Sequence, residues 1–194
     1  MAKMTKGEIR KALVLDTALD LLAEQGARGV VHRSVDNRAG LPEGSTSNVF
    51  RTRAALMNAT VEHHVARELE FAEVARSQLP EKLTIKQLAE VLSSSVEGLV
   101  SPDLSYLTAA RYEIYLEARR NPDVAPRVAA ARAAFKALLA DLLRQAGVKR
   151  PDQNSGKLLT LIDGLSVDRL FHPETALSHA DVASLLEMFL QGLK

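Results

Sequence analysis

A short polar segment carries the side chains best suited to contact a nucleic acid. Its members are Gly44, Ser45, Thr46, Ser47 and Asn48. Hydroxyl and amide groups can bind phosphates or contact base edges, and a glycine permits close approach of the backbone. Arg33 and Arg53 flank the segment, and their guanidinium groups suit phosphate oxygens. Together these residues predict contact with double-stranded DNA.

The elements around this segment have the order of a helix-turn-helix. A short helix is expected over residues 32–39, and the chain must turn after it. Gly40 permits positive φ and Pro42 removes a donor, so neither continues the helix. A second short helix over residues 43–50 would place its polar side in the major groove of DNA. The alternative is an ordinary helical corner whose polar face is solvated.

Several single residues have equally plain alternatives. Arg33 and Arg53 can be solvated surface charges, and Asn48 can be a side chain that stabilises its own helix. Lys6 and Arg10 can touch the flanking DNA backbone, although a solvated position is the simpler interpretation for both.

The sequence contains no set of residues with the spacing of a catalytic or metal-binding site. Cysteine is absent, which excludes a disulfide framework, a thiolate nucleophile and a Cys-ligated zinc site. His63 and His64 are adjacent and point to different faces of a helix. His172 and His179 flank a turn and could bind a metal with Glu174, although two solvated histidines are the simpler interpretation. Without a phosphate-binding Gly-rich loop or a G-x-S-x-G motif, the sequence predicts no enzyme, metal or cofactor.

The pattern of apolar residues predicts an all-α protein. They recur at spacings of three and four, and Ala, Leu, Glu and Arg are abundant. Thr5 and Glu8 have the spacing of a capping box, Gly26 ends the first helix, and Thr52 is a good N-cap for a long fourth helix. Later capping and stop signals mark helices over residues 84–99, 102–120, 122–145, 152–171 and 178–193. The outline has about nine helices.

Charge is unevenly distributed along the 194 residues. Residues 1–56 hold nine basic and six acidic side chains, which leaves 16 basic and 18 acidic in the remainder. A basic N-terminal segment followed by a slightly acidic remainder is typical of a small DNA-binding domain attached to a larger one. We therefore place a helix-turn-helix domain at residues 1–54 and a larger helical domain at 55–194. No apolar run is long enough to span a bilayer, and no signal-peptide pattern follows Met1. The expected location is the cytoplasm, with no membrane partner.

Four motifs resemble the N-terminal domain of the TetR family in order and spacing. They are A-E-Q-G (23–26), V-V-H-R-S-V (30–35), R-A-G-L-P-E-G (38–44) and F-R-T-R-A-A-L (50–56). Two later segments, R-Y-E-I-Y-L-E-A (111–118) and L-I-D-G-L (161–165), resemble the family's more variable C-terminal domain. The resemblance extends over most of the chain.

The chain departs from the family pattern at three positions. Val31 stands where the family usually has a capping Thr, Asp36 where it has a small Ala, and Ser47 where it has an aromatic residue. The expected consequence is an altered operator preference or, for Asp36, weaker DNA binding. Arg53 stands where the family commonly has a Lys at a phosphate, which preserves the charge and adds donors.

The resemblance also implies a C-terminal domain that encloses a small-molecule pocket and forms a homodimer through its last two helices. Tyr106, Arg111 and Tyr115 are candidates for the pocket, although such side chains are more often surface or core residues. The last two helices carry more apolar surface than one face needs, which favours a partner over a purely internal core. The residues expected at the dimer interface are Leu158, Leu161, Ile162, Leu165, Val182, Leu185, Leu186 and Phe189.

The sequence thus predicts a TetR-type regulator, most simply a repressor. It would bind a palindromic operator as a homodimer and be released by a small-molecule effector that the sequence does not identify. The alternative is a helical ligand-binding or adaptor dimer without DNA recognition, which Asp36 and the unusual recognition helix leave open.

Overall fold

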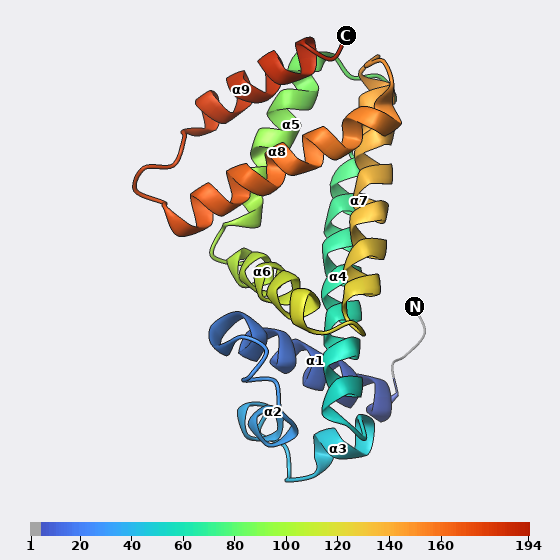
Figure 1. Ribbon diagram of the computed structural model, residues 1–194, viewed down its shortest axis with the longest axis vertical. Coiled ribbons are helices and arrows are strands. Elements are labelled where there is room, and N and C mark those ends of the chain that lie inside the picture. The colour runs from blue at the N-terminus through green and yellow to red at the C-terminus, as the bar shows by residue number, and fades with distance from the viewer. Residues whose placement is uncertain (1–4) are drawn as a thin grey trace. The chain divides into compact units, whose positions relative to one another are not determined.

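The computed structural model describes residues 5–194, which form helices joined by turns, without a strand in this range (Figure 1). The helices are α1 (Lys6–Gln25), α2 (His32–Arg38), α3 (Ser45–Val49), α4 (Arg53–Ser77), α5 (Ile85–Leu99), α6 (Ser105–Arg120), α7 (Ala125–Gln145), α8 (Pro151–Phe171) and α9 (His179–Gln191). The prediction of an all-α protein with about nine helices is confirmed for the described residues.

Local capping signals explain where several helices begin and end. The Thr5 hydroxyl accepts from the Glu8 N–H at 3.2 Å while the Glu8 carboxylate accepts from the Thr5 N–H at 2.7 Å, which forms the predicted capping box. Thr84 and Gln87 form a second one at the start of α5. Gly26 ends α1 with a φ of 66°, a left-handed conformation that favours glycine.

The third helix is shorter than the predicted range of residues 43–50. It begins only at Ser45, because Gly44 has a φ of 87° and cannot belong to a right-handed helix. It ends at Val49, and Phe50 is already extended. As predicted, the Thr52 hydroxyl then accepts from the Ala55 N–H at 3.1 Å and caps α4.

Two compact units make up the described chain. One comprises residues up to Glu68 with Ala109–Val128, and the other comprises Leu69–Thr108 with Ala129–Lys194. The first unit extends along α4 beyond the predicted boundary at residue 54, because Asp16 of α1 binds two side chains of α4. Its Oδ1 lies 2.8 Å from Nε2 of His63 and 2.9 Å from Nη1 of Arg67. The division into DNA-binding and ligand-binding domains stays a prediction.

The core of the first unit holds the helix-turn-helix in place. Its fully buried apolar side chains include Val14, Ala18, Leu19, Leu22, Val30, Val35, Leu56 and Val61. At the end of α2, Arg38 forms an ion pair with Glu24 of α1, with a distance of 3.1 Å from Nη1 to Oε1. Apolar burial and this ion pair therefore fix α2 against α1.

The second unit has a separate core around α5, which lies beside α8 and α9 (Figure 1). Its fully buried leucines and valine are Leu88, Val96, Leu143, Leu158, Leu186 and Leu190. The Leu83 N–H donates to the Gln145 carbonyl at 3.2 Å and joins the segment before α5 to the end of α7. The apolar faces of α8 and α9 are thus largely used within the chain.

Candidate nucleic-acid interface

A buried carboxylate joins the two helices of the helix-turn-helix. Asp36 of α2 is only 2% exposed, and its Oδ2 accepts a hydrogen bond from the Gly44 N–H at 2.9 Å. Its Oδ1 accepts from both the N–H and the hydroxyl of Thr46, at 2.8 and 2.6 Å. Three donors therefore compensate a charge that is unfavourable to bury alone. Asp36 supplies the N-terminal cap that Gly44, which has no side chain, cannot give α3.

The polar segment of α3 is divided between the interior and the surface. Ser45 and Thr46 are buried, so the expectation that their side chains face the DNA groove is wrong. Thr46 points inward because Asp36 accepts both of its donors. Ser47 and Asn48 are exposed, as expected for residues that contact DNA, and that contact stays a prediction.

The two arginines predicted to bind phosphate have different surroundings. Arg33 is exposed on α2 and forms no ion pair with another residue of the described range. Arg53 is also exposed, but its Nη2 donates to the Ala27 carbonyl. Part of the Arg53 guanidinium therefore binds the backbone of its own chain, although the residue as a whole remains exposed.

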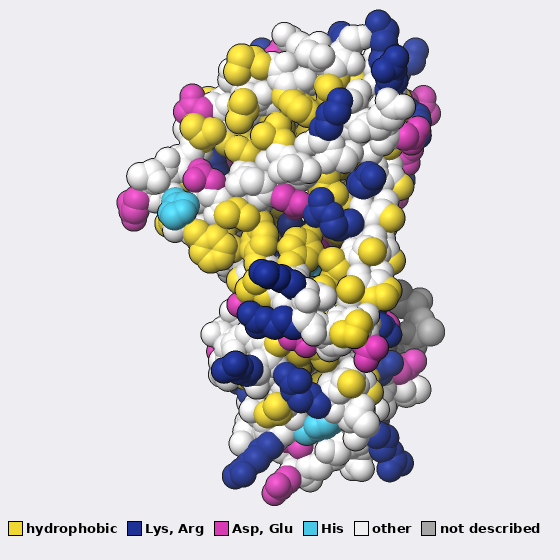
Figure 2. Space-filling model, in the orientation of Figure 1, with side chains coloured by type: hydrophobic (Ala, Val, Ile, Leu, Met, Phe, Trp, Pro, Cys, Tyr) yellow, Lys and Arg dark blue, Asp and Glu magenta, His cyan; other side chains and the backbone are white. Residues whose placement is uncertain are grey.

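Further basic side chains lie on the same unit. Lys6 and Arg10 of α1 are exposed, as expected, and so are Arg28 and Arg51, which the sequence analysis did not single out. Arg51 lies two residues after the end of α3, and that proximity in sequence is the signal that could have identified it. Figure 2 shows Lys and Arg side chains on the face that α2 and α3 present in this view. Such a surface is suited to phosphate contacts.

A histidine ties the start of α2 to the end of α3. Val31, at the N-cap position of α2, is extended and provides no side-chain cap, which is the consequence of its departure from Thr. The next residue, His32, has its Nε2 2.7 Å from the Phe50 carbonyl oxygen. Because a carbonyl only accepts, Nε2 carries the proton in this contact. Asp36 and His32 thus hold α3 at its two ends.

The predicted ligand-pocket residues are divided between the two compact units. Arg111 forms an ion pair with Glu68, with a distance of 2.7 Å from Nε to Oε1. Tyr115 is half-buried, and its ring lies edge-on to that of Tyr112 with centroids 6.1 Å apart. Tyr106 belongs to the other compact unit. A role of these residues in ligand binding stays a prediction.

Most of the residues predicted at a dimer interface belong to the core of the second unit. The buried ones are Leu158, Ile162, Leu165, Val182 and Leu186. The contacts of α8 and α9 with α5 and its neighbours bury these five residues within one chain, and their predicted contact with a second subunit stays a prediction. Leu161, Leu185 and Phe189 are only partly buried and remain candidates for contact with a second copy.

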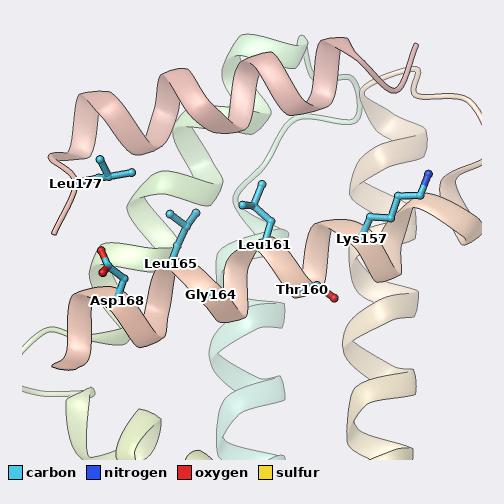
Figure 3. Close-up of a pocket in the computed structure, with 7 residues that line it drawn as sticks. All are labelled: Lys157, Thr160, Leu161, Gly164, Leu165, Asp168 and Leu177. Carbon is cyan, nitrogen blue, oxygen red and sulfur yellow. The ribbon is translucent and has the colours of Figure 1, made fainter. Parts of the chain in front are cut away.

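A groove of about 520 Å³ lies along α8, beside Leu177 of the segment that leads to α9 (Figure 3). Its lining is mostly apolar and consists of Lys157, Thr160, Leu161, Gly164, Leu165, Asp168 and Leu177. A Cβ added at Gly164 would meet no atom within 4 Å, so the groove is open at this point. Phe171 and Met188 are 59% and 63% exposed, and hydrophobic side chains gather over α8 and α9 in Figure 2. This surface is suited to a partner helix.

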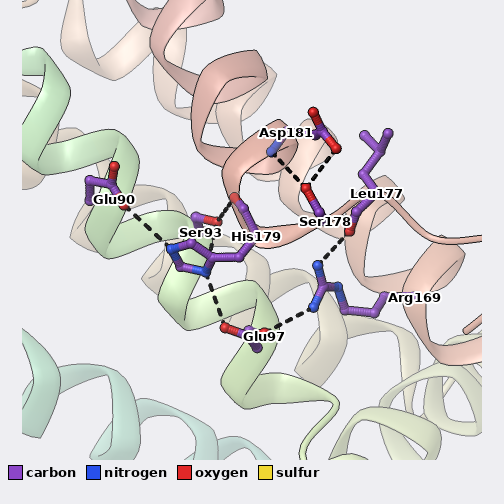
Figure 4. Close-up of polar contacts among 8 residues, drawn as sticks. All are labelled: Glu90, Ser93, Glu97, Arg169, Leu177, Ser178, His179 and Asp181. Atoms are coloured by element: carbon purple, nitrogen blue, oxygen red, sulfur yellow. Dashed lines mark hydrogen bonds and ion pairs between the residues drawn. The ribbon is translucent and has the colours of Figure 1, made fainter.

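His179 takes part in a polar contact between α9 and α5 (Figure 4). Its Nδ1 lies 3.1 Å from Oε2 of Glu97, its Nε2 lies 3.3 Å from Oε2 of Glu90, and its carbonyl accepts from the Ser93 hydroxyl at 2.9 Å. Within residues 5–194, no group of three His, Asp or Glu side chains is arranged to hold a metal. The contacts of His179 with Glu90, Ser93 and Glu97 join α9 to α5.

Comparisons with known proteins agree with this architecture. Residues 83–192 match the family model described as the tetracyclin repressor-like C-terminal domain. The HTH-type transcriptional regulator BetI of Burkholderia cenocepacia is 31% identical over 97 residues, which cover 50% of this chain and 50% of that protein. The match thus spans about half the length of the curated relative.

Solved structures resemble the whole described fold. A TetR family member from Streptomyces coelicolor has 23% identity and a TM-score of 0.72, covering 93% of this chain and 97% of its own. The multidrug binding protein EbrR, complexed with ethidium, has 25% identity and a TM-score of 0.69, with the same coverage of 93% and 97%.

The family model spans more than half of the chain, and the helix-turn-helix lies before the matched segment. The chain belongs to the TetR family of transcriptional regulators. Among the helices of the described range, none is long and apolar enough to cross a membrane.

Proposed function

We propose that this chain is a DNA-binding transcriptional repressor that occupies a palindromic operator as a homodimer and leaves it when a small-molecule effector binds. The observation that carries the proposal is the helix-turn-helix, in which α3 exposes Ser47 and Asn48 beside a basic surface. Membership of the TetR family supports it. The proposed role requires no catalysis.

The exposed groups suit the two kinds of DNA contact. An asparagine amide can make two hydrogen bonds to adenine in the major groove, and a serine hydroxyl can bind several base edges, so we assign base recognition to Asn48 and Ser47. Arg33 and the free donors of Arg53 would bind phosphates and set the register of α3 in the groove.

Dimerisation would use the outer surface of α8 and α9. Leu161 lines the groove on α8, while Leu185 and Phe189 remain partly exposed on α9. A second copy placed there would bury this apolar surface and generate two-fold symmetry. Two recognition helices related in this way fit two half-sites about 34 Å apart, or a multiple of that distance.

The effector would act by changing the separation of the two recognition helices. Since α4 has residues in both compact units, a ligand that shifts this helix can move α3. The effector must bind the DNA-free state more tightly than the bound state, or it could not release the operator. Crystal structures with and without the effector that show equal spacing of the recognition helices would contradict this mechanism.

Selection of bound duplexes from a random oligonucleotide pool tests the proposal. We expect the purified protein to enrich a palindromic site. Asn48→Ala should change the preferred bases, because it removes a base contact, while Arg53→Ala should weaken binding to all sequences, because it removes a phosphate contact. Enrichment of no sequence at low salt would contradict the proposed function.

The competing hypothesis of an adaptor dimer without DNA recognition relied partly on Asp36. Because the Asp36 carboxylate is buried and hydrogen-bonded, it does not present an exposed negative charge to DNA phosphates. A salt titration separates the two hypotheses. A DNA reader loses duplex affinity steeply as salt rises, whereas an adaptor has no duplex affinity to lose.

A further inference from the structure

We propose that Asp36 is a positioning residue for DNA recognition: it fixes α3 against α2 and removes Gly44 and Thr46 from the groups that read DNA. The proposal rests on the proposed function and refines it. Side-chain readout by α3 is then limited to Ser47 and Asn48.

The recognition helix cannot hold its own conformation. It contains five residues, and isolated helices shorter than about 12 residues are marginal in water. Backbone hydrogen bonds close its two ends: the Asn48 N–H donates to the Gly44 carbonyl at 3.0 Å and the Phe50 N–H to the Thr46 carbonyl at 2.8 Å. The orientation of α3 therefore depends on contacts with its neighbours.

Asp36 supplies that contact at the N-terminal end of α3. The carboxylate accepts two backbone N–H groups, from Gly44 and Thr46, that have no carbonyl partner within so short a helix. The backbone of Asp36 also takes part, since its carbonyl accepts from the Leu41 N–H at 2.9 Å. One residue of α2 therefore binds the turn and the first residues of α3 together.

The same geometry decides which groups of α3 are available to DNA. The Thr46 hydroxyl donates to Asp36 Oδ1 at 2.6 Å, and Thr46 has no exposed surface. The Gly44 N–H, which a phosphate would otherwise approach, is bound to Oδ2. Ser47 and Asn48 are the next two residues, and both are exposed. Asp36 thus sets the side of α3 that faces outward.

Amide hydrogen exchange on the full DNA-free chain tests the cap directly. Asp36→Ala should speed exchange at the Thr46 amide by about tenfold, which is the loss expected for an N-cap side chain. Asp36→Asn should give a smaller change at Thr46, because its oxygen can still accept there while its NH₂ group opposes the Gly44 donor. Asn37→Ala, at the next and exposed position of α2, is the matched control. Unchanged Thr46 exchange in Asp36→Ala would overturn the proposal.

DNA selection tests the consequence for recognition. Asp36→Ala should lower the ratio of operator to random-duplex affinity by roughly tenfold, while its random-duplex affinity and salt dependence stay near wild type, because the phosphate contacts remain. A general loss of folding would instead reduce both affinities. Thr46→Ser, which keeps both donors to Asp36, should select the wild-type sequence, whereas Ser47→Ala and Asn48→Ala should not. A new consensus for Thr46→Ser would contradict the internal role of Thr46.

The two experiments keep the proposal separate from the proposed function. If the wild-type chain enriches no duplex, the repressor function fails, while the exchange data still decide whether Asp36 caps α3. If the wild-type chain enriches an operator and Asp36→Ala discriminates equally well, the repressor function stands and the positioning role is refuted.

Discussion

Arg111 of α6 forms a buried ion pair with Glu68 of α4, in which Nε of Arg111 donates to Oε1 of Glu68 at 2.7 Å. The two side chains are only 11% and 6% exposed. Burial lowers the pKa of Arg111, but attraction to Glu68 and the hydrogen bonds outweigh burial and leave the pKa raised. The Arg111 guanidinium therefore stays charged inside the first unit. His64 lies close to the same carboxylate, with Nε2 3.5 Å from Oε1.

Removing one member of this pair should destabilise the protein more than removing both. We expect Arg111→Met to lower the free energy of unfolding by about 3 kcal/mol, because it leaves the Glu68 carboxylate buried without its main partner. The double variant Arg111→Met, Glu68→Leu should recover most of that loss. Urea denaturation measures both values, and a double variant less stable than Arg111→Met would argue against a buried ion pair.

Replacement of Asp20 should stabilise the protein in a pH-dependent way. Burial, and next the nearby Glu24 carboxylate, raise the pKa of Asp20 above 3.8. The ionised form is therefore disfavoured in the folded state, so wild type gains stability as pH falls through the folded pKa. Because Asp20 is partly exposed, Asp20→Asn should gain at most about 0.5 kcal/mol at neutral pH.

That gain should shrink as the pH falls through the pKa of Asp20 in the folded protein, and it should be gone below the pKa of Asp20 in the unfolded chain, where wild type is protonated in both states. Thermal unfolding of wild type and Asp20→Asn between neutral and acidic pH measures the difference in stability between the two proteins. Asp103→Asn, which removes one exposed carboxylate from the other unit, is the control for net charge. A constant difference at every pH would show that ionisation of Asp20 is not its cause.

A side chain at Gly164 should block the proposed dimerisation without disturbing the single chain. The groove on α8 has open space at this glycine, and glycine is a poor helix former, so Gly164→Leu should leave the monomer at least as stable. A second helix could no longer approach closely. Sedimentation velocity should then show a monomer. Gly98→Leu adds the same side chain at an open position on α5 and should remain dimeric.

The two predicted phosphate ligands should differ in their effects on stability. Arg33→Ala and Arg53→Ala should each weaken duplex binding for all sequences and reduce the salt slope by about 1. Only Arg53→Ala should also lower the melting temperature, because Arg53 donates to the Ala27 carbonyl. Fluorescence anisotropy at several salt concentrations, with thermal unfolding, measures both effects. An unchanged salt slope in both variants would remove these residues from the DNA contact.

Local sequence was enough to predict the helices and their class. Helix caps and stops depend on residues only three or four positions apart, so they can be recognised from the sequence alone. Examples are the capping boxes at Thr5 and Thr84, the stop at Gly26 and the cap at Thr52. The helix-turn-helix followed from Gly40 and Pro42 for the same reason. Family membership followed from motifs that the structure leaves in helices of the expected order.

Tertiary contacts decided which side chains of those helices face outward. Asp36 and Thr46 are ten positions apart, and only the folded turn brings the carboxylate to α3, where it turns Thr46 inward. Leu158 and Leu186 have the same apolar character whether they meet a partner or their own core, and the packing of α8 and α9 around α5 buries them within one chain. The spacing of residue types along the sequence predicts which face of a helix is apolar. Which residues of that face are buried depends on the distant segments that pack against it, and only the tertiary structure shows those segments.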